Sequence, residues 1–159
     1  SVYAAKIGTK ATVDGKKTAQ VNAETTIVDT VEYTNLIPGQ EYTVKGVLMD
    51  KKTNQSIGVT AETTFKAEKS DGSVEVTFKA DTTKYESLVV FEDLYIGGNL
   101  VAQHADINDE DQTVTFTKET PPDEKVKTGA GILVAILMGL ALGFGGAGIY
   151  TLRRKKKFF

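Results

Sequence analysis

The stretch VAQHADINDEDQTVTF, residues 101–116, contains a polar acidic loop followed by an alternating strand. In that strand Gln112, Val114 and Phe116 share one face, and the threonines between them share the other. The apolar face of such a strand is usually the buried one, so the pattern aims Gln112 into a hydrophobic core. A buried primary amide needs partners for its donors and its acceptor. The same stretch contains His104, the single histidine of the chain.

Similar strand signals recur along the chain up to about residue 117. Turn signals such as Asp14-Gly15 and Pro38-Gly39 separate them. Residues 70–73 (SDGS) predict a hairpin between strands at 63–67 and 74–78. Roughly seven to nine short strands, with turns every 8–12 residues, are typical of a sandwich. Residues 1–117 are therefore predicted to be all-β, as an immunoglobulin-like antiparallel β-sandwich.

Composition excludes several kinds of site. The chain has no cysteine and one histidine, so we expect no disulfide, no metal site and no cofactor. The formal net charge is −2, and without the five basic residues at 153–157 the remainder carries −7 (−2 less 5). An acidic body argues against nucleic-acid binding. Because the sequence opens at Ser1 inside strand-like sequence, we expect the C-terminal part of a longer secreted protein.

The character of the sequence changes after residue 117. Residues 118–128, with Pro121-Pro122, predict a polar, semi-rigid linker. Residues 129–152 contain no charged side chain, and a helix of 24 residues at about 1.5 Å each can span a hydrocarbon core of about 30 Å. We therefore predict a single transmembrane helix there. The basic tail, residues 153–159, predicts a cytoplasmic C-terminus with the sandwich outside. Its charged residues are Arg153, Arg154, Lys155, Lys156 and Lys157.

Five polar side chains fall on faces that are otherwise apolar: Thr9, Asp29, Glu92, His104 and Gln112. Any one of them is most simply explained as a hydrogen-bonded core residue. Five in one small sandwich are harder to explain, because each buried charge carries a desolvation cost. The set contains a hydroxyl, an amide, an imidazole and two carboxyls. These are the groups needed to join Thr9 to Gln112 through an ester, with release of ammonia.

In such a reaction the Thr9 hydroxyl attacks the side-chain carbonyl of Gln112, and His104 is the natural base for its proton. If Asp29 and Glu92 are buried side by side, they do not both ionise easily, so one can keep a proton and polarise the amide. A dry core excludes competing water, and contact between the groups gives a high effective molarity. The reaction occurs once per molecule, so we expect no enzymatic turnover.

Three segments of the chain resemble the VaFE repeat, or Thr–Gln ester-bond domain, of Gram-positive surface adhesins. They are VDTVEYTNLIPGQEYTVKGVLMD (28–50), VVFEDLY (89–95) and HADINDEDQTV (104–114). The resemblance covers Ile7 to about Thr117. It implies an immunoglobulin-like domain of an adhesin stalk, with an ester between the first and last strands and with neighbouring repeats of the same longer protein.

The resemblance also implies a role for each inward polar residue. Thr9, in TKATVDG, is the implied nucleophile, and Gln112 is the implied electrophile. His104 is the implied base, eight residues before Gln112. Asp29, in IVDTVEY, and Glu92, in VVFEDLY, are the implied accompanying acids.

The C-terminal region resembles a sortase cell-wall sorting signal. The motif consists of Lys125, Val126, Lys127, Thr128 and Gly129, and an apolar span and a basic end follow it. The resemblance implies that sortase cuts the Thr–Gly bond and joins the new carboxyl to peptidoglycan. The usual leading Leu-Pro is replaced by Lys-Val, so a plain membrane anchor is the alternative. Both readings place the sandwich at the cell surface.

Two alternative cross-links remain open. Thr12 is a rival nucleophile, although alternation places it on the opposite face from Ile7 and Val13. A Lys–Asn isopeptide bond would use Lys6 or Lys10 with Asn108, although both lysines fall on the outward face.

Two alternative functions use the same inward polar set without a cross-link. A membrane-anchored ligand-binding sandwich would usually show clustered exposed aromatics, and Tyr85 and Tyr95 are the nearest candidates. A hydrolase would use Thr9, His104 and Asp29, but the sequence has no nucleophile elbow or glycine-rich oxyanion loop.

Overall fold

The structure, a computed structural model, describes residues 4–118. The linker beyond residue 118, the sorting motif 125–129, the apolar span 129–152 and the basic tail 153–159 lie outside the described residues. Among residues 4–118 no helix is long and apolar enough to cross a membrane.

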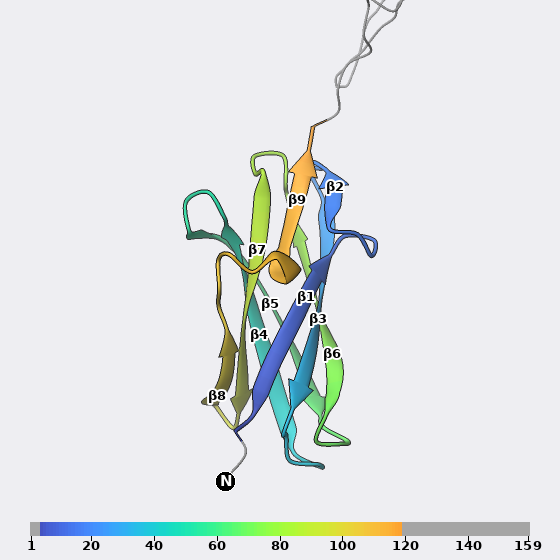
Figure 1. The fold of residues 1–159 in the computed structure, drawn as a ribbon, viewed down its shortest axis with the longest axis vertical. Coiled ribbons are helices and arrows are strands. Elements are labelled where there is room, and N and C mark those ends of the chain that lie inside the picture. Colours follow the sequence, from blue (N-terminus) through green and yellow to red (C-terminus); the bar gives the residue numbers. More distant parts are fainter. Residues whose placement is uncertain (1–3, 119–159) are drawn as a thin grey trace, which may run out of the picture. The chain divides into compact units, whose positions relative to one another are not determined.

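Two β-sheets pack face to face (Figure 1). The smaller sheet has the order β1-β3-β6, with bounds Lys6–Thr12, Thr25–Thr34 and Gly72–Ala80. The larger sheet has the order β2-β9-β7-β4-β5, with bounds Thr18–Gln20, Thr113–Thr117, Ser87–Ile96, Glu41–Asp50 and Gln55–Lys66. Strand β8 (Asn99–His104) also pairs with β7, and a short 3₁₀ helix, η1 (Glu110–Gln112), precedes β9. The prediction of an all-β sandwich is confirmed.

Alternation explains which side chains fill the space between the sheets. In β3 every second residue from Thr25 to Tyr33 is buried, and in β4 the buried face runs from Tyr42 to Leu48. The central apolar side chains are fully buried, namely Ile27, Val31, Val44, Leu48, Val76, Phe78, Leu88, Leu94 and Val114. Burying a side chain of this size stabilises the fold by about 1.5–3 kcal/mol.

Strand β7 positions the segment between β8 and β9. Strand β9 pairs with Ser87–Val89, at the start of β7, and β8 pairs with β7 from Glu92 onward. Residues 105–112, including η1, therefore connect two strands that lie along β7 one after the other. On the other side of the core, β1 passes close to η1 (Figure 1).

Two sequence predictions about pairing were wrong. Residues 70–73 do not close a hairpin, because β5 lies in the larger sheet while β6 pairs with β3 in the smaller one. Turn residues allow the chain to reverse, but they do not decide which sheet the next strand joins. The sandwich is also not wholly antiparallel, since the three-residue strand β2 pairs in parallel with β9.

The two ends of the described chain leave from opposite ends of the sandwich. Strand β1 begins at one end of the sandwich, and β9 finishes at the other (Figure 1). The first and last strands thus enter and leave along the long direction of this domain.

Candidate cross-link site

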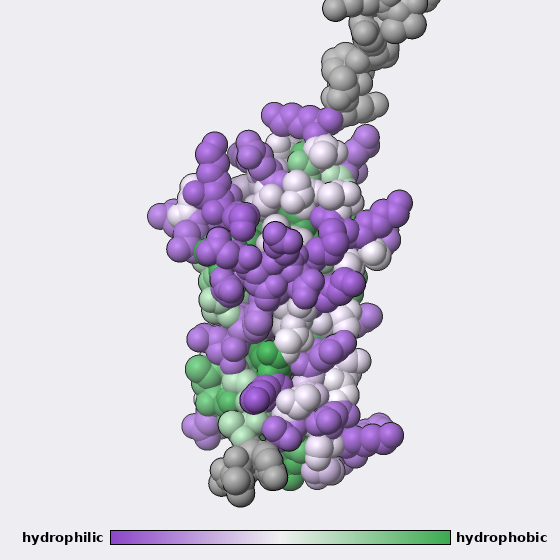
Figure 2. All heavy atoms as spheres, in the orientation of Figure 1, coloured by the Kyte–Doolittle hydropathy of each residue, from purple (hydrophilic) through white to green (hydrophobic). Residues whose placement is uncertain are grey.

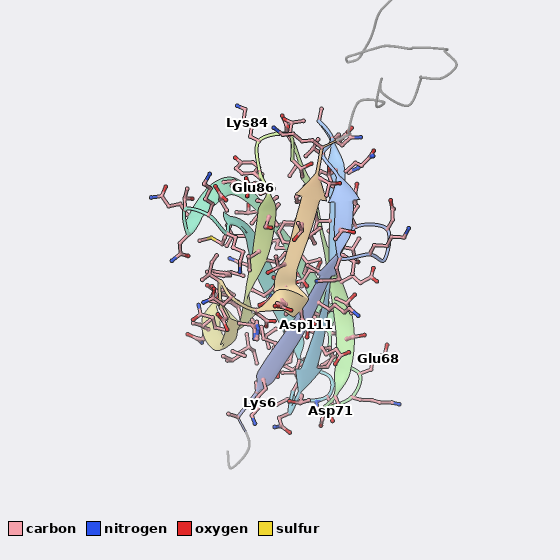
Figure 3. All side chains as sticks on the ribbon, turned by 45° about the horizontal axis from the view of Figure 1, so that its top comes forward. Lys6, Glu68, Asp71, Lys84, Glu86 and Asp111 are labelled. Carbon is pink, nitrogen blue, oxygen red and sulfur yellow. The ribbon has the colours of Figure 1, made fainter. Side chains whose placement is uncertain are left out.

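The structure brings Thr9 and Gln112 into the same part of the core. Thr9 lies in the middle of β1, on the inward face with Ala11, and is 8% exposed. Gln112 is the last residue of η1 and is 0% exposed. Figures 1 and 3 both show η1 beside β1, with the labelled Asp111 on η1. The short helix η1, which directly precedes β9, thus lies beside the strand that contains the hydroxyl.

Two buried carboxyls come from opposite sheets. Asp29 lies in β3 opposite Ala11 of β1, and Glu92 lies in β7 opposite Gly46 of β4. Both side chains are fully buried. Burial, together with the adjacent Asp29, raises the pKa of Glu92 to about 10. Burial also raises the pKa of Asp29, although Glu92 and Lys17 lower it in part. The pair therefore holds at least one proton at neutral pH.

These four residues contain seven buried side-chain oxygen and nitrogen atoms that have no hydrogen-bond partner. The atoms are Thr9 Oγ1, both carboxyl oxygens of Asp29 and Glu92, and both side-chain polar atoms of Gln112. Two ionised carboxylates offer only acceptors, so a hydrogen bond between them requires a proton on one. Within residues 4–118, no other buried side-chain polar atom lacks a partner. An unpaired buried group costs about 1–3 kcal/mol, and such groups are rare in native structures. Their concentration at one place therefore points to a role other than stabilising the fold.

His104 lies at the edge of this cluster and is not fully buried. It is the last residue of β8 and pairs with Glu92 of β7, so the two side chains share a face. Its Nε2 lies 2.5 Å from Oδ2 of Asp109, and 29% of its side chain is exposed. Partial burial raises the pKa of Asp109, but hydrogen bonds from His104 and Asp111 outweigh this and lower it overall. An ionised Asp109 accepts, so in the neutral ring Nε2 carries the hydrogen and Nδ1 is left as an acceptor.

Three residues that support the site were not singled out from the sequence. Gly46 leaves room for the Glu92 carboxyl, because a Cβ there would lie 2.5 Å from Glu92 Oε1 and 2.5 Å from Phe78 Cζ. A glycine on the buried face of the alternating run 42–48 was the available signal. Asp109 caps η1 and contacts His104. Lys17, whose ammonium contacts β1 and η1, left no pattern in the sequence.

The residues of the alternative cross-links lie elsewhere. Lys6, Lys10 and Asn108 are exposed, and Lys6 lies at the outer end of β1 (Figure 3). Thr12 is half-buried at the last position of β1.

Hydrophilic side chains cover the surface around η1 (Figure 2). The side chains of Asp29, Glu92 and Gln112 are fully buried, so none of them faces solvent as a surface site would require.

Solved structures with the same fold include a bacterial adhesin. A bacterial adhesin from Mobiluncus mulieris, containing intramolecular disulfide, isopeptide and ester bond cross-links, matches with a TM-score of 0.63 and 24% identity. The match covers 75% of this chain and 59% of the adhesin chain, and a second crystal form gives the same values. A glycosyl hydrolase family 2 member from Bacteroides cellulosilyticus DSM 14838 matches with a TM-score of 0.50 and 12% identity, over 63% of this chain and 14% of that one. At these identities the likeness shows the fold alone.

Sequence comparison identifies the family directly. No curated protein matches the chain. The family model described as "T-Q ester bond containing domain" matches residues 5–116, which is most of the chain and all of the cluster described above. This protein therefore belongs to the family of T-Q ester bond containing domains.

Proposed function

We propose that this domain forms an intramolecular ester between Thr9 and Gln112 and serves as an immunoglobulin-like stalk domain of a Gram-positive surface adhesin or pilin-like protein. The main support is the cluster of buried polar atoms without partners, which includes the Thr9 hydroxyl and the Gln112 amide. Membership of the ester-bond family supports the same chemistry.

The proposed reaction exchanges one bond for another. Thr9 Oγ1 bonds to Cδ of Gln112, the Cδ–Nε2 bond breaks, and ammonia leaves. His104 takes the hydroxyl proton at Nδ1 and returns it to the departing nitrogen. Asp109 accepts from Nε2 and so supports the imidazolium that forms.

The two carboxyls have different proposed roles. Glu92, with its pKa raised to about 10, is protonated at neutral pH and can donate a hydrogen bond to the amide oxygen. This donor stabilises the negative charge that develops on that oxygen in the tetrahedral intermediate. Asp29 lies against Glu92 and is the natural acceptor when Glu92 is not engaged with the amide. No substrate enters and no turnover follows, so the domain is not an enzyme in the ordinary sense.

The proposed ester changes the path of a pulling force. Because β1 begins at one end of the sandwich and β9 finishes at the other, tension enters through β1 and leaves through β9 (Figure 1). An ester between Thr9 and Gln112 connects these two segments covalently and bypasses the chain between them. Strands β3 to β8 then need not separate when the stalk is stretched.

Anchoring of the domain is a further part of the proposal and rests on sequence. The motif at residues 125–129, the apolar span 129–152 and the basic residues 153–157 fit a sortase signal that links the protein to peptidoglycan. Incubating the chain with a sortase and an amine nucleophile tests this, since cleavage between Thr128 and Gly129 gives a defined product. An intact chain under conditions that process a standard signal favours a membrane anchor.

Peptide mapping with trypsin tests the proposed ester. Trypsin cuts after lysine, so the ester would join residues 7–10 to residues 85–118 in one branched peptide. An isopeptide bond at Lys10 would instead block cleavage after residue 10. Recovery of unlinked, full-mass peptides 7–10 and 85–118 from the folded protein would refute the ester.

A further inference from the structure

Lys17 makes contacts that connect the two reacting segments. Its Nζ donates to the backbone oxygens of Ala11 and Asp111, each at 2.6 Å. Ala11 lies two residues after Thr9 in β1, and Asp111 directly precedes Gln112 in η1. One ammonium therefore bridges the strand that contains the hydroxyl and the turn that presents the amide.

The backbone around Lys17 is itself held in place. Just before it, Val13 and Lys16 exchange two hydrogen bonds of 2.9 Å across a tight turn. Just after the turn, the carbonyl of Lys17 accepts from Thr115 N of β9 at 3.0 Å. The long side chain thus starts from a fixed point beside β9, and its ammonium contacts both η1 and β1.

The charge of Lys17 also acts on the cluster. The side chain is half-buried, and burial lowers its pKa while the nearby Asp111 opposes that effect. The ammonium in turn lowers the pKa of Asp29. It therefore favours an ionised Asp29 beside a protonated Glu92, and so separates the roles of the two carboxyls.

We propose that Lys17 is a positioning residue for ester formation, holding β1 against η1 so that the Thr9 hydroxyl stays within reach of the Gln112 carbonyl. This inference rests on the proposed Thr9–Gln112 ester. Once the ester exists, the covalent bond holds the two segments together. Lys17 therefore affects the rate of cross-linking more than the properties of the finished product.

The rate of ammonia loss tests this role. The full chain is made by cell-free translation with detergent, samples are stopped in acid at intervals, and intact mass gives the reacted fraction. Lys17→Met removes the ammonium and keeps the length of the side chain, and Lys16→Met is the matched control at an exposed neighbour. We expect Lys16→Met to react within about twofold of the wild type and Lys17→Met to react on the order of 10–100-fold more slowly. Lys17→Arg should recover most of the rate, because a guanidinium can donate to both carbonyls.

A second experiment, in a chain that cannot form the ester, distinguishes an effect of Lys17 on the reaction from an effect on folding. Gln112→Ala has no electrophile, so the circular dichroism of Lys17→Met in that background reports the fold alone, and we expect it unchanged. Equal rates for Lys17→Met and Lys16→Met, in a wild type that reacts, would overturn the role of Lys17 and leave the ester standing. Loss of the fold in the Gln112→Ala background would overturn it too, since the ammonium would then hold the whole sandwich. A wild type that never loses ammonia would instead overturn the ester itself.

Discussion

Two groups of buried polar side chains lie in this sandwich, one built around Thr82 and the other around Thr9, and they differ in how well their polar atoms are paired. Thr25 Oγ1 lies 2.9 Å from Thr82 Oγ1. Thr82 Oγ1 also accepts from Asn22 N at 3.0 Å and donates to Asn22 O at 3.1 Å. Thr9 is buried to a similar degree, yet its hydroxyl has no partner. A threonine that serves the fold is satisfied by its neighbours, whereas Thr9 lies beside groups suited to making a bond.

Loss of the cross-link should give the largest effect. Thr9→Val keeps the shape of the side chain and removes the hydroxyl that would form the ester. In the chain-entropy model a link that closes a loop of roughly 100 residues stabilises by up to about 4.7 kcal/mol, by analogy with a disulfide. We expect the free energy of unfolding to fall by up to this amount in urea denaturation. A change of less than about 0.5 kcal/mol, the range of an ordinary surface substitution, would contradict the cross-link.

The unreacted cluster should make stability depend on pH. Glu92 has a pKa of about 10 in the folded domain and an ordinary value of 4.5. Between these values the folded state binds more protons than the unfolded state, so the free energy of unfolding falls as pH rises. In the Thr9→Val variant the free energy of unfolding should fall by at most about 1.4 kcal/mol for each pH unit, or by about 3 kcal/mol between pH 6 and pH 8. Urea midpoints at the two pH values measure it. Adding Glu92→Gln to this variant should make the free energy of unfolding less dependent on pH. An unchanged pH dependence would show that Glu92 is not the group responsible.

Filling the space beside Glu92 should disturb the cluster. Gly46→Ala places a methyl 2.5 Å from both Glu92 Oε1 and Phe78 Cζ, so the carboxyl must move. Overpacking of this kind costs about 1–3 kcal/mol. We expect a lower thermal midpoint and incomplete loss of ammonia. Gly8→Ala is the matched control, because a Cβ at Gly8 meets nothing within 4 Å. Complete cross-linking in Gly46→Ala would show that the position of Glu92 does not matter.

The hydrogen-bonded threonines, Thr25 and Thr82, should affect stability without affecting the cross-link. Thr82→Val removes the hydroxyl that bonds to Thr25 and Asn22. Losing these contacts should lower the free energy of unfolding by about 1–2 kcal/mol. The mass of the protein should keep its full deficit of one ammonia, because Thr82 takes no part in the bond. Thr82→Val should therefore lower the free energy of unfolding and leave the ammonia deficit in place. Thr9→Val should lower the free energy of unfolding and also abolish the deficit.

Sequence periodicity predicted the burial of Asp29 and Glu92, because a strand places every second residue on one face. Gln112 is buried as predicted, but it ends η1 and directly precedes β9, whereas the sequence pattern placed it in the strand itself. It predicted less about pairing, since the SDGS turn at 70–73 fits a hairpin as well as a crossing between sheets. Strand β2 was missed because its three residues, Thr18–Gln20, are too few to show alternation. Lys17 was missed because its contacts are to backbone carbonyls, which no side-chain pattern records.

Intact mass under denaturing conditions tests the central proposal most directly. The folded wild-type chain should be lighter than its sequence by one ammonia, and the deficit should vanish in Thr9→Val and in Gln112→Ala. Because a Lys–Asn isopeptide also releases ammonia, the deficit must persist in Lys10→Ala and in Asn108→Ala. Hydroxylamine, which cleaves esters and leaves isopeptides intact, should open the link. A folded wild type of full mass, or a deficit that survives Thr9→Val, would contradict the proposed ester.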